Sequence, residues 1–410
     1  MRVAFLSWPW PGISEAPGMG ELLMTPGPVM LSSRVIRALS RQACSHVSQE
    51  FAEALSETRD MLKEVFRTSH DVVIAPGSSS LGLEMAIANS VRPGDKVIVV
   101  SSGYFSDRIA EVVRRHRGIP VLVGGDPRKG VSVEAVEEVR DKHPDAVALC
   151  VVHVETSTGV VNSVERIGRL AREEGLLHIV DAVSSVGGMD VRTDEWGIDY
   201  CVAGPQKALA APPGLALLSV SQEALDMANS RPEDPFTFYM DVRGWVRAMR
   251  DPFKRYVTHA VHLVFALKEA LSVVLEEGLE RRFERHRLLA EAVRRGVRAL
   301  GLKLFPEEGH EADTLTAIEM PEGISSRVVA ELMLERGVRV APGWGEYAER
   351  VLRIGHMGNI GAEHVLRTLS CLESALSELG FEAEGAVKEA SSYLSGFDQE
   401  ILKPPDEIPC

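Results

Sequence analysis

The chain has 410 residues, 45% of them hydrophobic and 25% charged, which is typical of a soluble globular protein with a large domain and a smaller one. Its formal net charge of −14, with acidic and basic residues mixed along the chain, argues against nucleic acid as a partner. The five cysteines show no CxxC spacing, so they predict neither a disulfide framework nor a metal site and favour a reducing cytoplasm.

The N-terminal stretch predicts an irregular arm over residues 1–24. Its apolar run is very short and is broken by prolines. A secretory signal needs a longer apolar region, and a membrane-spanning helix needs about 20 apolar residues. We therefore expect neither a signal peptide nor a membrane anchor in this stretch.

From about residue 70, short apolar runs alternate with amphipathic segments. The runs lie in DVVIAPGSSS, KVIVVSSGYFS, AVALCVVHVETS, LLHIVDAVSS and YCVAGPQKAL. Strands rich in Val, Ile and Leu, with almost no polar alternation, are buried on both faces, as in a parallel sheet covered by helices. The pattern predicts an α/β fold, with a large domain over residues 25–280 and ligands at the carboxyl ends of its strands.

The second half of the chain predicts a smaller α+β domain over residues 281–383. Residues 259–296 have apolar residues at helical spacing and predict one or two long helices that bridge to it. LTAIEM, VRVAPG and VLRIGHMG are strand candidates, and SSRVVAELMLERG and AEHVLRTLSCLESALSEL are helix candidates. Residues 384–410, acidic and then rich in proline, form a C-terminal tail.

The first chemical motif is a serine cluster between a strand and a helix. Ser78, Ser79 and Ser80 follow Gly77 at a predicted helix start, where backbone N–H groups, hydroxyls and the helix dipole favour an anion. The alternative is a serine that only caps the helix. Because the motif is neither a Walker A loop nor GxGxxG, a single phosphoryl group fits it better than a nucleotide.

Polar residues also end the next strands. Asp181 closes an apolar strand, so its carboxylate either pairs with a cationic group such as a protonated ring nitrogen or caps the following turn. His153 and Thr156 end another strand, and a histidine there is commonly a satisfied core residue. Phe105, beside Tyr104, either stacks on a planar ligand or closes the core.

Two cationic residues complete the set. Lys207 lies among alanines, prolines and leucines, where it is either a snorkelling surface lysine or a desolvated nucleophile with a lowered pKa. Arg353, beside glycines, is either a surface residue or a clamp for a carboxylate. A phosphate cradle, a carboxylate for a ring nitrogen, an aromatic ring, a nucleophilic lysine and a carboxylate clamp together predict a pyridoxal phosphate site.

The order of these motifs resembles one enzyme family. GSSS, HVETSTG, DAVSS, GPQKAL, RYVTHAV and RIGHMG follow one another as in the class V (fold type I) aminotransferases, most like the alanine–glyoxylate and serine–pyruvate or serine–glyoxylate enzymes. The resemblance covers about residues 22–380. It implies a mostly parallel, seven-stranded sheet between helices, pyridoxal 5′-phosphate as the cofactor, and a homodimer with shared active sites.

The resemblance also implies roles for single residues. Lys207 would form a Schiff base with the cofactor, Asp181 would hold its pyridinium nitrogen, and Arg353, helped by Gly27, would bind the substrate carboxylate. The other cofactor contacts would be Ser78, Ser79, Ser80 and Gln206 at the phosphate, Phe105 and Val183 on the ring faces, Thr156 at the ring hydroxyl, and Tyr256 and Thr258 at the phosphate of the neighbouring subunit. The chain departs from the family pattern at Ser79, where glycine is usual, and at Phe105, where the alanine–glyoxylate enzymes have tryptophan.

The resulting expectation is a cytoplasmic enzyme that moves the amino group of alanine or serine to glyoxylate or pyruvate. Trp344, Tyr347 and the arm are predicted to crowd the site and so to favour small substrates. A phosphonate transaminase of the 2-aminoethylphosphonate type and a lyase on the same fold remain alternatives. A cysteine desulfurase is disfavoured, because no cysteine lies near Arg353 in the sequence. Outside the enzymes, the alternative is an α/β protein that only binds a ligand. Such a protein would carry no chromophore.

Overall fold

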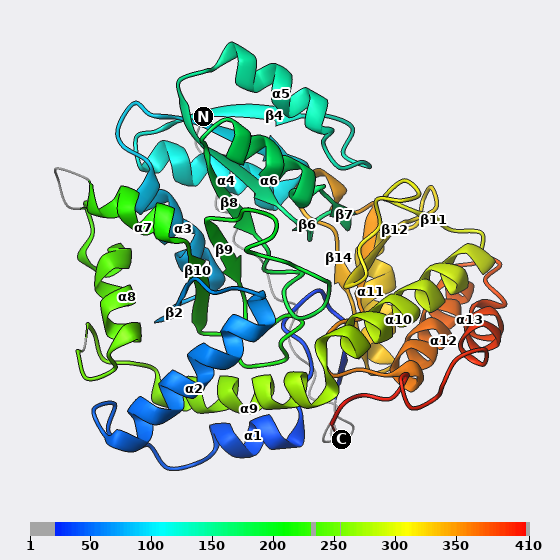
Figure 1. Cartoon of the computed structure of the whole chain (residues 1–410). Helices are drawn as coiled ribbons and strands as arrows, with labels where there is room; N and C mark the ends of the chain where they lie inside the picture. The colour runs from blue at the N-terminus through cyan, green and yellow to red at the C-terminus, as the bar shows by residue number, and fades with distance from the viewer. Residues whose placement is uncertain (1–20, 231–234, 255, 407–410) are drawn as a thin grey trace.

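The computed structural model describes residues 21–230, 235–254 and 256–406 (Figure 1). The helices are α1 (Ser33–Leu39), α2 (Gln49–Phe66), α3 (Ser79–Ser90), α4 (Tyr104–Arg115), α5 (Val133–Lys142), α6 (Val164–Glu173), α7 (Gln222–Asn229), η1 (Phe238–Met240), α8 (Val242–Arg250), α9 (Val261–Glu277), α10 (Leu279–Ala299), α11 (Ser326–Glu335), η2 (Gly345–Tyr347), α12 (Ala362–Glu378) and α13 (Ala386–Leu394). The strands are β1 (Leu22–Leu23), β2 (Asp71–Pro76), β3 (Lys96–Ser101), β4 (Ile119–Gly124), β5 (Ala146–Val152), β6 (Val154–Glu155), β7 (Val160–Val161), β8 (Leu177–Asp181), β9 (Tyr200–Ala203), β10 (Leu215–Val220), β11 (Lys303–Leu304), β12 (Leu315–Glu319), β13 (Val338–Arg339), β14 (Ala341–Pro342) and β15 (Val351–Gly355).

A seven-stranded sheet organises the first part of the chain. Its strand order is β2-β10-β9-β8-β5-β3-β4, and β10 is the strand that runs antiparallel to its neighbours. The β9–β8–β5–β3–β4 pairs are all parallel. The predicted α/β fold with a mostly parallel sheet is therefore confirmed. Strand β4, at the edge of the sheet, was not singled out in the sequence, and its Ile119 and Leu122 are half exposed.

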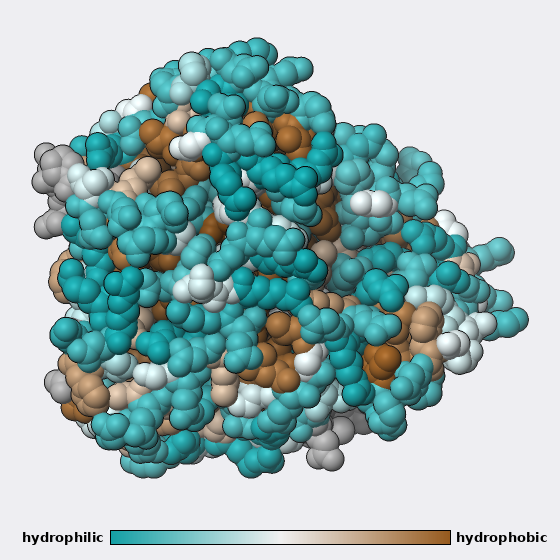
Figure 2. Space-filling model, viewed as in Figure 1, coloured by the Kyte–Doolittle hydropathy of each residue, from teal (hydrophilic) through white to brown (hydrophobic). Residues whose placement is uncertain are grey.

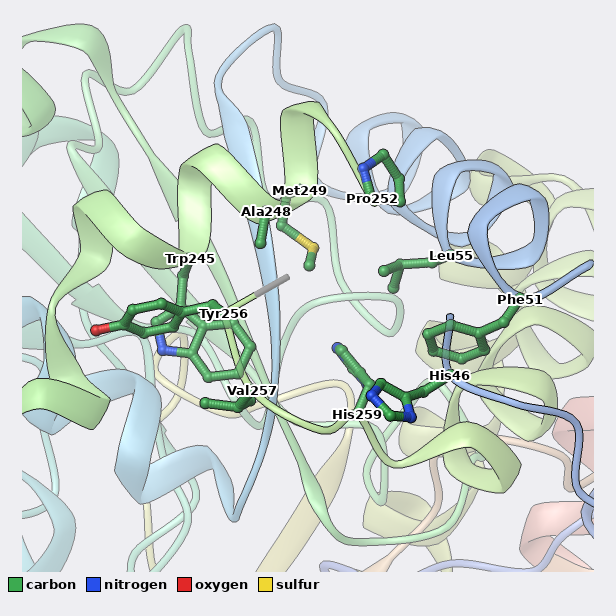
Figure 3. Close-up of a pocket in the computed structure, with 10 residues that line it drawn as sticks. All are labelled: His46, Phe51, Leu55, Trp245, Ala248, Met249, Pro252, Tyr256, Val257 and His259. Carbon is green, nitrogen blue, oxygen red and sulfur yellow. The ribbon is translucent and has the colours of Figure 1, made fainter. Parts of the chain in front are cut away.

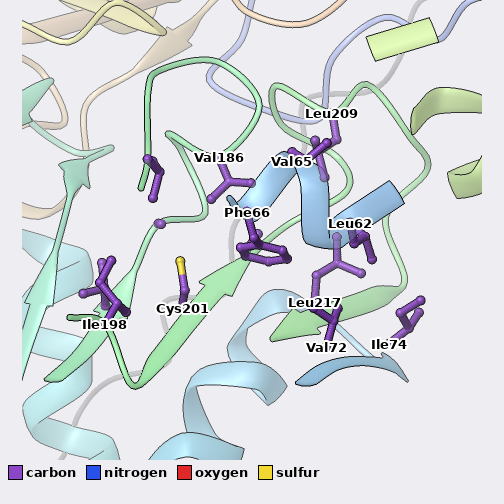
Figure 4. Close-up of a cluster of buried hydrophobic side chains, with 14 of the residues drawn as sticks. Leu62, Val65, Phe66, Val72, Ile74, Val186, Ile198, Cys201, Leu209 and Leu217 are labelled. Carbon is purple, nitrogen blue, oxygen red and sulfur yellow. The ribbon is translucent and has the colours of Figure 1, made fainter. Parts of the chain in front are cut away.

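Helices cover both faces of this sheet. Alternate side chains of each strand point to opposite faces, so neighbours such as Cys201 and Val202 belong to different hydrophobic clusters. One face packs against α2, α5, α6 and α9, as Figure 4 shows for Phe66 of α2 above Cys201 and Leu217. The other face packs against α3, α4, α7 and part of α8. With apolar layers on both faces, the strands leave mainly their ends for a polar site.

A second sheet, in the order β11-β12-β15-β14, is antiparallel and packs against α10 and α11. Helices α12 and α13 pack on these helices and share the same apolar core, which we call the core of the second unit. The predicted helical segment, one or two helices over residues 259–296, forms two helices. They divide at Gly278, whose φ of +83° lies in the left-handed region that glycine tolerates. Helix α13 lies inside the stretch that composition had suggested to be a tail. It packs on α10, because Ala386, Ala390 and Leu394 are buried.

The first described residues form a two-stranded sheet with a segment more than 300 residues later in the chain. Residues 1–20 of the expected arm lie outside the described residues, and residues 22–23 form β1, which pairs in parallel with β13. Leu22 and Met24 are buried in the core of the second unit. The part of the expected irregular arm that the structure describes is therefore a paired strand. This strand is stabilised by apolar contacts with residues that are distant in the sequence, and a local sequence pattern does not predict such contacts.

Across the described residues, helices are too short or too polar to cross a membrane. The face of the molecule in Figure 2 is mostly hydrophilic, and its hydrophobic residues form small separate patches.

Candidate active site

The predicted site residues follow the carboxyl ends of several strands of the seven-stranded sheet. Asp181 is the last residue of β8, and Lys207 follows β9 by four residues. Ser79 begins α3 after β2, and Phe105 lies in the first turn of α4 after β3. Because the carboxyl ends of parallel strands share one edge of a sheet, these residues of distant sequence positions come to one place.

Lys207 does not snorkel to the surface. Its side chain is partly buried, and its Nζ donates a hydrogen bond to the carbonyl oxygen of Pro26. Burial, and then the positive charge of Arg353, lowers the pKa of Lys207 to about 8, while Asp181 opposes the shift. The structure thus places a lysine that is easily neutralised, and therefore nucleophilic, in the interior of the site.

Gly27 packs directly on this lysine. A Cβ at Gly27 would lie 2.5 Å from Cδ and 2.9 Å from Cε of Lys207, and the φ of Gly27 is +108°. Only glycine therefore lets the N-terminal segment approach this closely. The structure places Gly27 against Lys207, so the segment closes one side of the site.

Asp181 is 7% exposed. One of its carboxylate oxygens caps the following turn, and the other is available for a cationic group. Its Oδ1 accepts a hydrogen bond from the Val183 backbone N–H at 3.0 Å, as a turn cap would. Its Oδ2 has no hydrogen bond to the described residues. Burial raises the pKa of Asp181, against the Val183 hydrogen bond and the charges of Arg108 and Lys207. A cation that reached Oδ2 would restore the favourable charged state of this carboxylate.

The serine cluster has the features of an anion cradle. Ser78 occupies the N-cap position of α3, yet its side chain makes no capping hydrogen bond. The Ser79 hydroxyl is buried without a hydrogen-bond partner among the described residues, and Ser80 lies in the same first turn. Buried polar atoms are normally satisfied, so the simple capping alternative leaves Ser79 unexplained.

Three of the predicted cofactor-binding residues pack around Gly204. A Cβ at Gly204 would overlap the Ser79 hydroxyl and would lie 3.0 Å from Val183 Cγ1 and 3.1 Å from Gln206 Oε1. Ser79, Val183 and Gln206 therefore meet around a point where only glycine fits. The arrangement brings the predicted phosphate ligands next to the residue predicted to pack under the cofactor ring.

Arg353 is also inside the protein, 5% exposed, and not on the strand surface. Its Nε and Nη2 donate to the Pro342 carbonyl at 3.1 and 2.7 Å, and its Nη1 donates to the Thr156 carbonyl at 2.9 Å. Burial lowers the pKa of Arg353 to about 10, and Glu155 opposes this. Arg353 has no ion-pair partner among the described residues, so an anionic ligand would compensate its charge.

Thr156 and His153 have partners on the loop after Asp181. The Thr156 and Ser184 hydroxyls lie 2.6 Å apart, and His153 Nδ1 lies 2.9 Å from the Ser185 hydroxyl. The His153 ring also packs edge-on against Trp196. Burial lowers the pKa of His153 to about 4, so this histidine is neutral at physiological pH and is the satisfied core residue that the sequence allowed.

An aromatic cluster joins α4 to the second unit. Tyr104 stacks on Trp344 with ring centroids 5.1 Å apart and an interplanar angle of 21°. Phe105 lies edge-on to both rings. Trp344 is two residues beyond Pro342, which holds Arg353, so this cluster stands beside the candidate carboxylate clamp. Tyr347 instead packs edge-on against Phe305.

The sequence did not predict the roles of two charged residues at the site: Arg108 was not singled out, and Glu155 was expected only as one of several polar residues at a strand end. Glu155 is fully buried and accepts hydrogen bonds from the backbone N–H groups of Phe105 and Ser106, so it caps α4 from another strand. The guanidinium carbon of Arg108 lies 4.9 Å from the centre of the Phe105 ring, and its Nε is buried without a hydrogen-bond partner among the described residues. The i, i+3 spacing from Phe105 was the signal that could have found Arg108.

Tyr256 and Thr258 are not brought to this site by the single chain. The Tyr256 hydroxyl donates to the Phe238 carbonyl, and its ring packs edge-on against Trp245. Figure 3 shows Tyr256 beside Trp245 in a pocket that also contains His259. Thr258 is exposed. Among the described residues, Lys207 donates its hydrogen bond to Pro26 and the Ser79 hydroxyl has no hydrogen-bond partner, so neither is hydrogen-bonded to Tyr256 or Thr258.

The chain is similar to known proteins over most of its length. The family model described as aminotransferase class-V matches residues 30–354. An uncharacterized aminotransferase of Methanocaldococcus jannaschii is 39% identical over 91% of this chain and 97% of its own length. The alanine–glyoxylate aminotransferase of Oryctolagus cuniculus is 35% identical over 87% and 92%. The crystal structure of ureidoglycine–glyoxylate aminotransferase from Bacillus subtilis superimposes with a TM-score of 0.89, at 32% identity, over 93% of this chain and all of that chain.

Proposed function

Because this chain belongs to the class-V aminotransferase family and is an aminotransferase that depends on pyridoxal 5′-phosphate, we propose that it moves the amino group of alanine or serine to glyoxylate or pyruvate. The observation that carries the proposal is the partly buried Lys207 amine next to an unpaired Arg353 and a buried Asp181. The names of the rabbit and Bacillus relatives, both glyoxylate aminotransferases, support glyoxylate as the acceptor.

The residues present fit this cofactor. The unsatisfied Ser79 hydroxyl and the uncapped start of α3 suit its phosphate, with Ser78, Ser80 and Gln206 nearby. The free oxygen of Asp181 suits its ring nitrogen. In this proposal Phe105 and Val183 cover the two ring faces, and Thr156 binds the ring hydroxyl. When bound, pyridoxal phosphate supplies an electron sink for the bond that breaks at Cα of the donor.

The chain's own residues hold the substrate and move the proton. Arg353 binds the donor carboxylate and so fixes which bond at Cα faces Lys207. The Lys207 amine, with a pKa of about 8, takes the proton from Cα and later returns it, because a base with a pKa near the working pH transfers protons in both directions. Asp181 stays ionised and holds the proton of the ring nitrogen. The Pro26 carbonyl orients the amine.

Small donors suit the space around Arg353. The Tyr104–Trp344 stack stands beside this residue, and the segment at Gly27 closes against Lys207. Both restrict the room for a side chain on the donor, whereas alanine and serine add only a methyl or hydroxymethyl group.

We also propose a homodimer with shared sites. Phe236, Phe238 and Phe253 are 68%, 69% and 55% exposed, which is unusual for large apolar side chains and suits an interface. Tyr256 packs against Phe238, so Tyr256 and the neighbouring Thr258 lie in the same region. In the dimer they would bind the phosphate in the partner's site. The unpaired Cys44, Cys150, Cys201 and Cys371 support a reducing, cytoplasmic setting.

A complementation experiment tests the shared sites. Lys207→Ala and the double variant Tyr256→Phe/Thr258→Ala are each expected to be nearly inactive. Mixed and allowed to exchange subunits, they form heterodimers in which one of the two sites has every native residue. About half of the dimers are then mixed, so activity recovers to about a quarter of the wild type. No recovery, with exchange demonstrated by mass, would contradict shared sites.

The visible spectrum of the purified protein with pyridoxal phosphate tests the proposed reaction. Wild type should show a band near roughly 400–430 nm that alanine or serine moves to about 330 nm, while Lys207→Ala should not form it. A band that no amino acid shifts, with elimination products accumulating, would favour the lyase alternative. A band shifted by 2-aminoethylphosphonate in place of alanine would favour a phosphonate transaminase.

A further inference from the structure

A buried charged cluster lies at the junction of α9 and α10. Glu277 ends α9, and Arg282, Arg285 and His286 lie in the first turns of α10. Glu277 Oε2 is 2.6 Å from Arg282 Nη1, and its Oε1 is 2.6 Å from Arg285 Nε. The side chains of Glu277, Arg282 and Arg285 are 6%, 1% and 0% exposed. We call these four residues the loop clamp.

Arg282 binds the loops that follow Asp181 and Lys207. Its Nε donates to the Gly187 carbonyl at 2.8 Å, and its Nη2 donates to the Ala208 carbonyl. Gly187 is six residues after Asp181, and Ala208 is the residue next to Lys207. One guanidinium therefore connects the two loops that carry the proposed ring-nitrogen carboxylate and the proposed nucleophile.

Arg285 binds the loop that follows Arg353. Its Nη1 donates to the Ile360 carbonyl at 2.6 Å, and its Nη2 donates to the Gly358 carbonyl at 3.0 Å. His286 joins this loop to the one after Asp181. Its Nε2 accepts from the Gly358 N–H at 3.0 Å, so its Nδ1 carries the proton and donates to the Gly188 carbonyl at 3.0 Å. Burial keeps the pKa of His286 well below its usual value, which preserves this neutral form.

The charges of the clamp explain why it binds carbonyls. One carboxylate faces two guanidiniums, so a net positive charge is buried, and the remaining N–H groups require acceptors away from water. Backbone carbonyls of the three site loops are those acceptors. Glu277 orients both guanidiniums at once, so the positions of the three loops depend on a single carboxylate.

We propose that the loop clamp positions Lys207 and Asp181 relative to Arg353, with Arg282 holding the first two and Arg285 holding the third. The inference rests on the proposed function only where activity is the readout. Misplacement of a reacting group by about 1 Å can cost about a hundredfold in rate, so hydrogen bonds this close to Lys207 matter for turnover.

Two variants separate positioning from stability. Arg282→Gln should lower kcat and weaken binding of pyridoxal phosphate about tenfold or more, with little change in the KM of the amino donor. Arg285→Gln should raise that KM about tenfold or more, with little change in kcat and in the visible band. Leu289→Ala, on the same helix but buried in the apolar core of the second unit, is the control for lost stability. Identical patterns in all three variants would overturn the proposal.

Amide hydrogen exchange of the cofactor-free protein gives a readout independent of activity. In Glu277→Gln, peptides covering residues 186–189, 207–211 and 356–361 should exchange at least tenfold faster than in wild type, and should not do so in Leu289→Ala. If Glu277→Gln does not fold, Arg285→Lys, which keeps the charge but loses the paired donors, should show the effect in residues 356–361 alone. Unchanged exchange in these loops would overturn the clamp, whereas a missing visible band with faster exchange would refute only the proposed function.

Discussion

The lowered pKa of Lys207 predicts a specific pH dependence of stability. In the unfolded chain this amine has its ordinary pKa of 10.5, and in the cofactor-free folded protein it has a pKa of about 8. Between these values the unfolded state binds more protons than the native state, so the contribution of Lys207 to stability rises with pH. Below pH 8 the buried charge is fully present and the folded protein carries its full penalty.

The magnitude follows from the shift. Each pKa unit corresponds to about 1.4 kcal/mol, so the change between pH 7 and pH 10 is about 2.5 kcal/mol. Lys207→Met keeps the apolar stem and removes the amine. Subtracting its free energy of unfolding from that of wild type at each pH cancels every other titrating group. Relative to this variant, wild type should therefore gain about 2.5 kcal/mol on going from pH 7 to pH 10.

Urea unfolding of the cofactor-free proteins, followed by tryptophan fluorescence at pH 7 and pH 10, measures this difference. Lys388→Met is the matched control, because Lys388 is exposed on α13 and makes no ion pair with the described residues. A difference for Lys207→Met that stayed the same at both pH values would show that the amine is solvated. Burial would then not be what makes this amine a nucleophile.

Three further changes test the rest of the site. Gly204→Ala should raise the dissociation constant of pyridoxal phosphate about tenfold, because its Cβ would overlap the Ser79 hydroxyl. Fluorescence titration measures this constant, and an unchanged value would show that Ser79 does not bind the phosphate. Glu155→Gln should lower the free energy of unfolding by about 2 kcal/mol, since the capped N–H groups of α4 lose a charged acceptor. Urea unfolding measures this free energy, and a change below about 0.5 kcal/mol would contradict the capping role. Trp344→Ala should lower the KM of larger donors such as phenylalanine relative to alanine in a transamination assay, and an unchanged ratio would show that the Tyr104–Trp344 stack does not limit donor size.

The sequence alone determined the α/β fold and the places where its polar residues collect. Apolar runs such as those of β5 and β8 are buried on both faces, and a local pattern of that kind is readable without any tertiary contact. Asp181 and Lys207 could therefore be assigned to strand ends. The strand formed by residues 22–23 and the helix formed by residues 386–394 were not predicted, because their short apolar faces are stabilised only by the distant core that they cover.

Tertiary structure alone decided which alternative held for each charged residue. The sequence left Lys207 and Arg353 between surface and interior, since burial depends on what packs over a side chain. The hydrogen bond between Lys207 and the Pro26 carbonyl joins residues 181 positions apart in the sequence. The one between Arg353 and the Thr156 carbonyl joins residues 197 positions apart. Likewise, Glu277 and its arginines read in the sequence as the charged face of a long helix. In the fold, that face is buried against the loops beside Lys207 and Arg353. Hydrogen bonds between distant segments produce no periodic pattern in the sequence, so only the tertiary structure shows this burial.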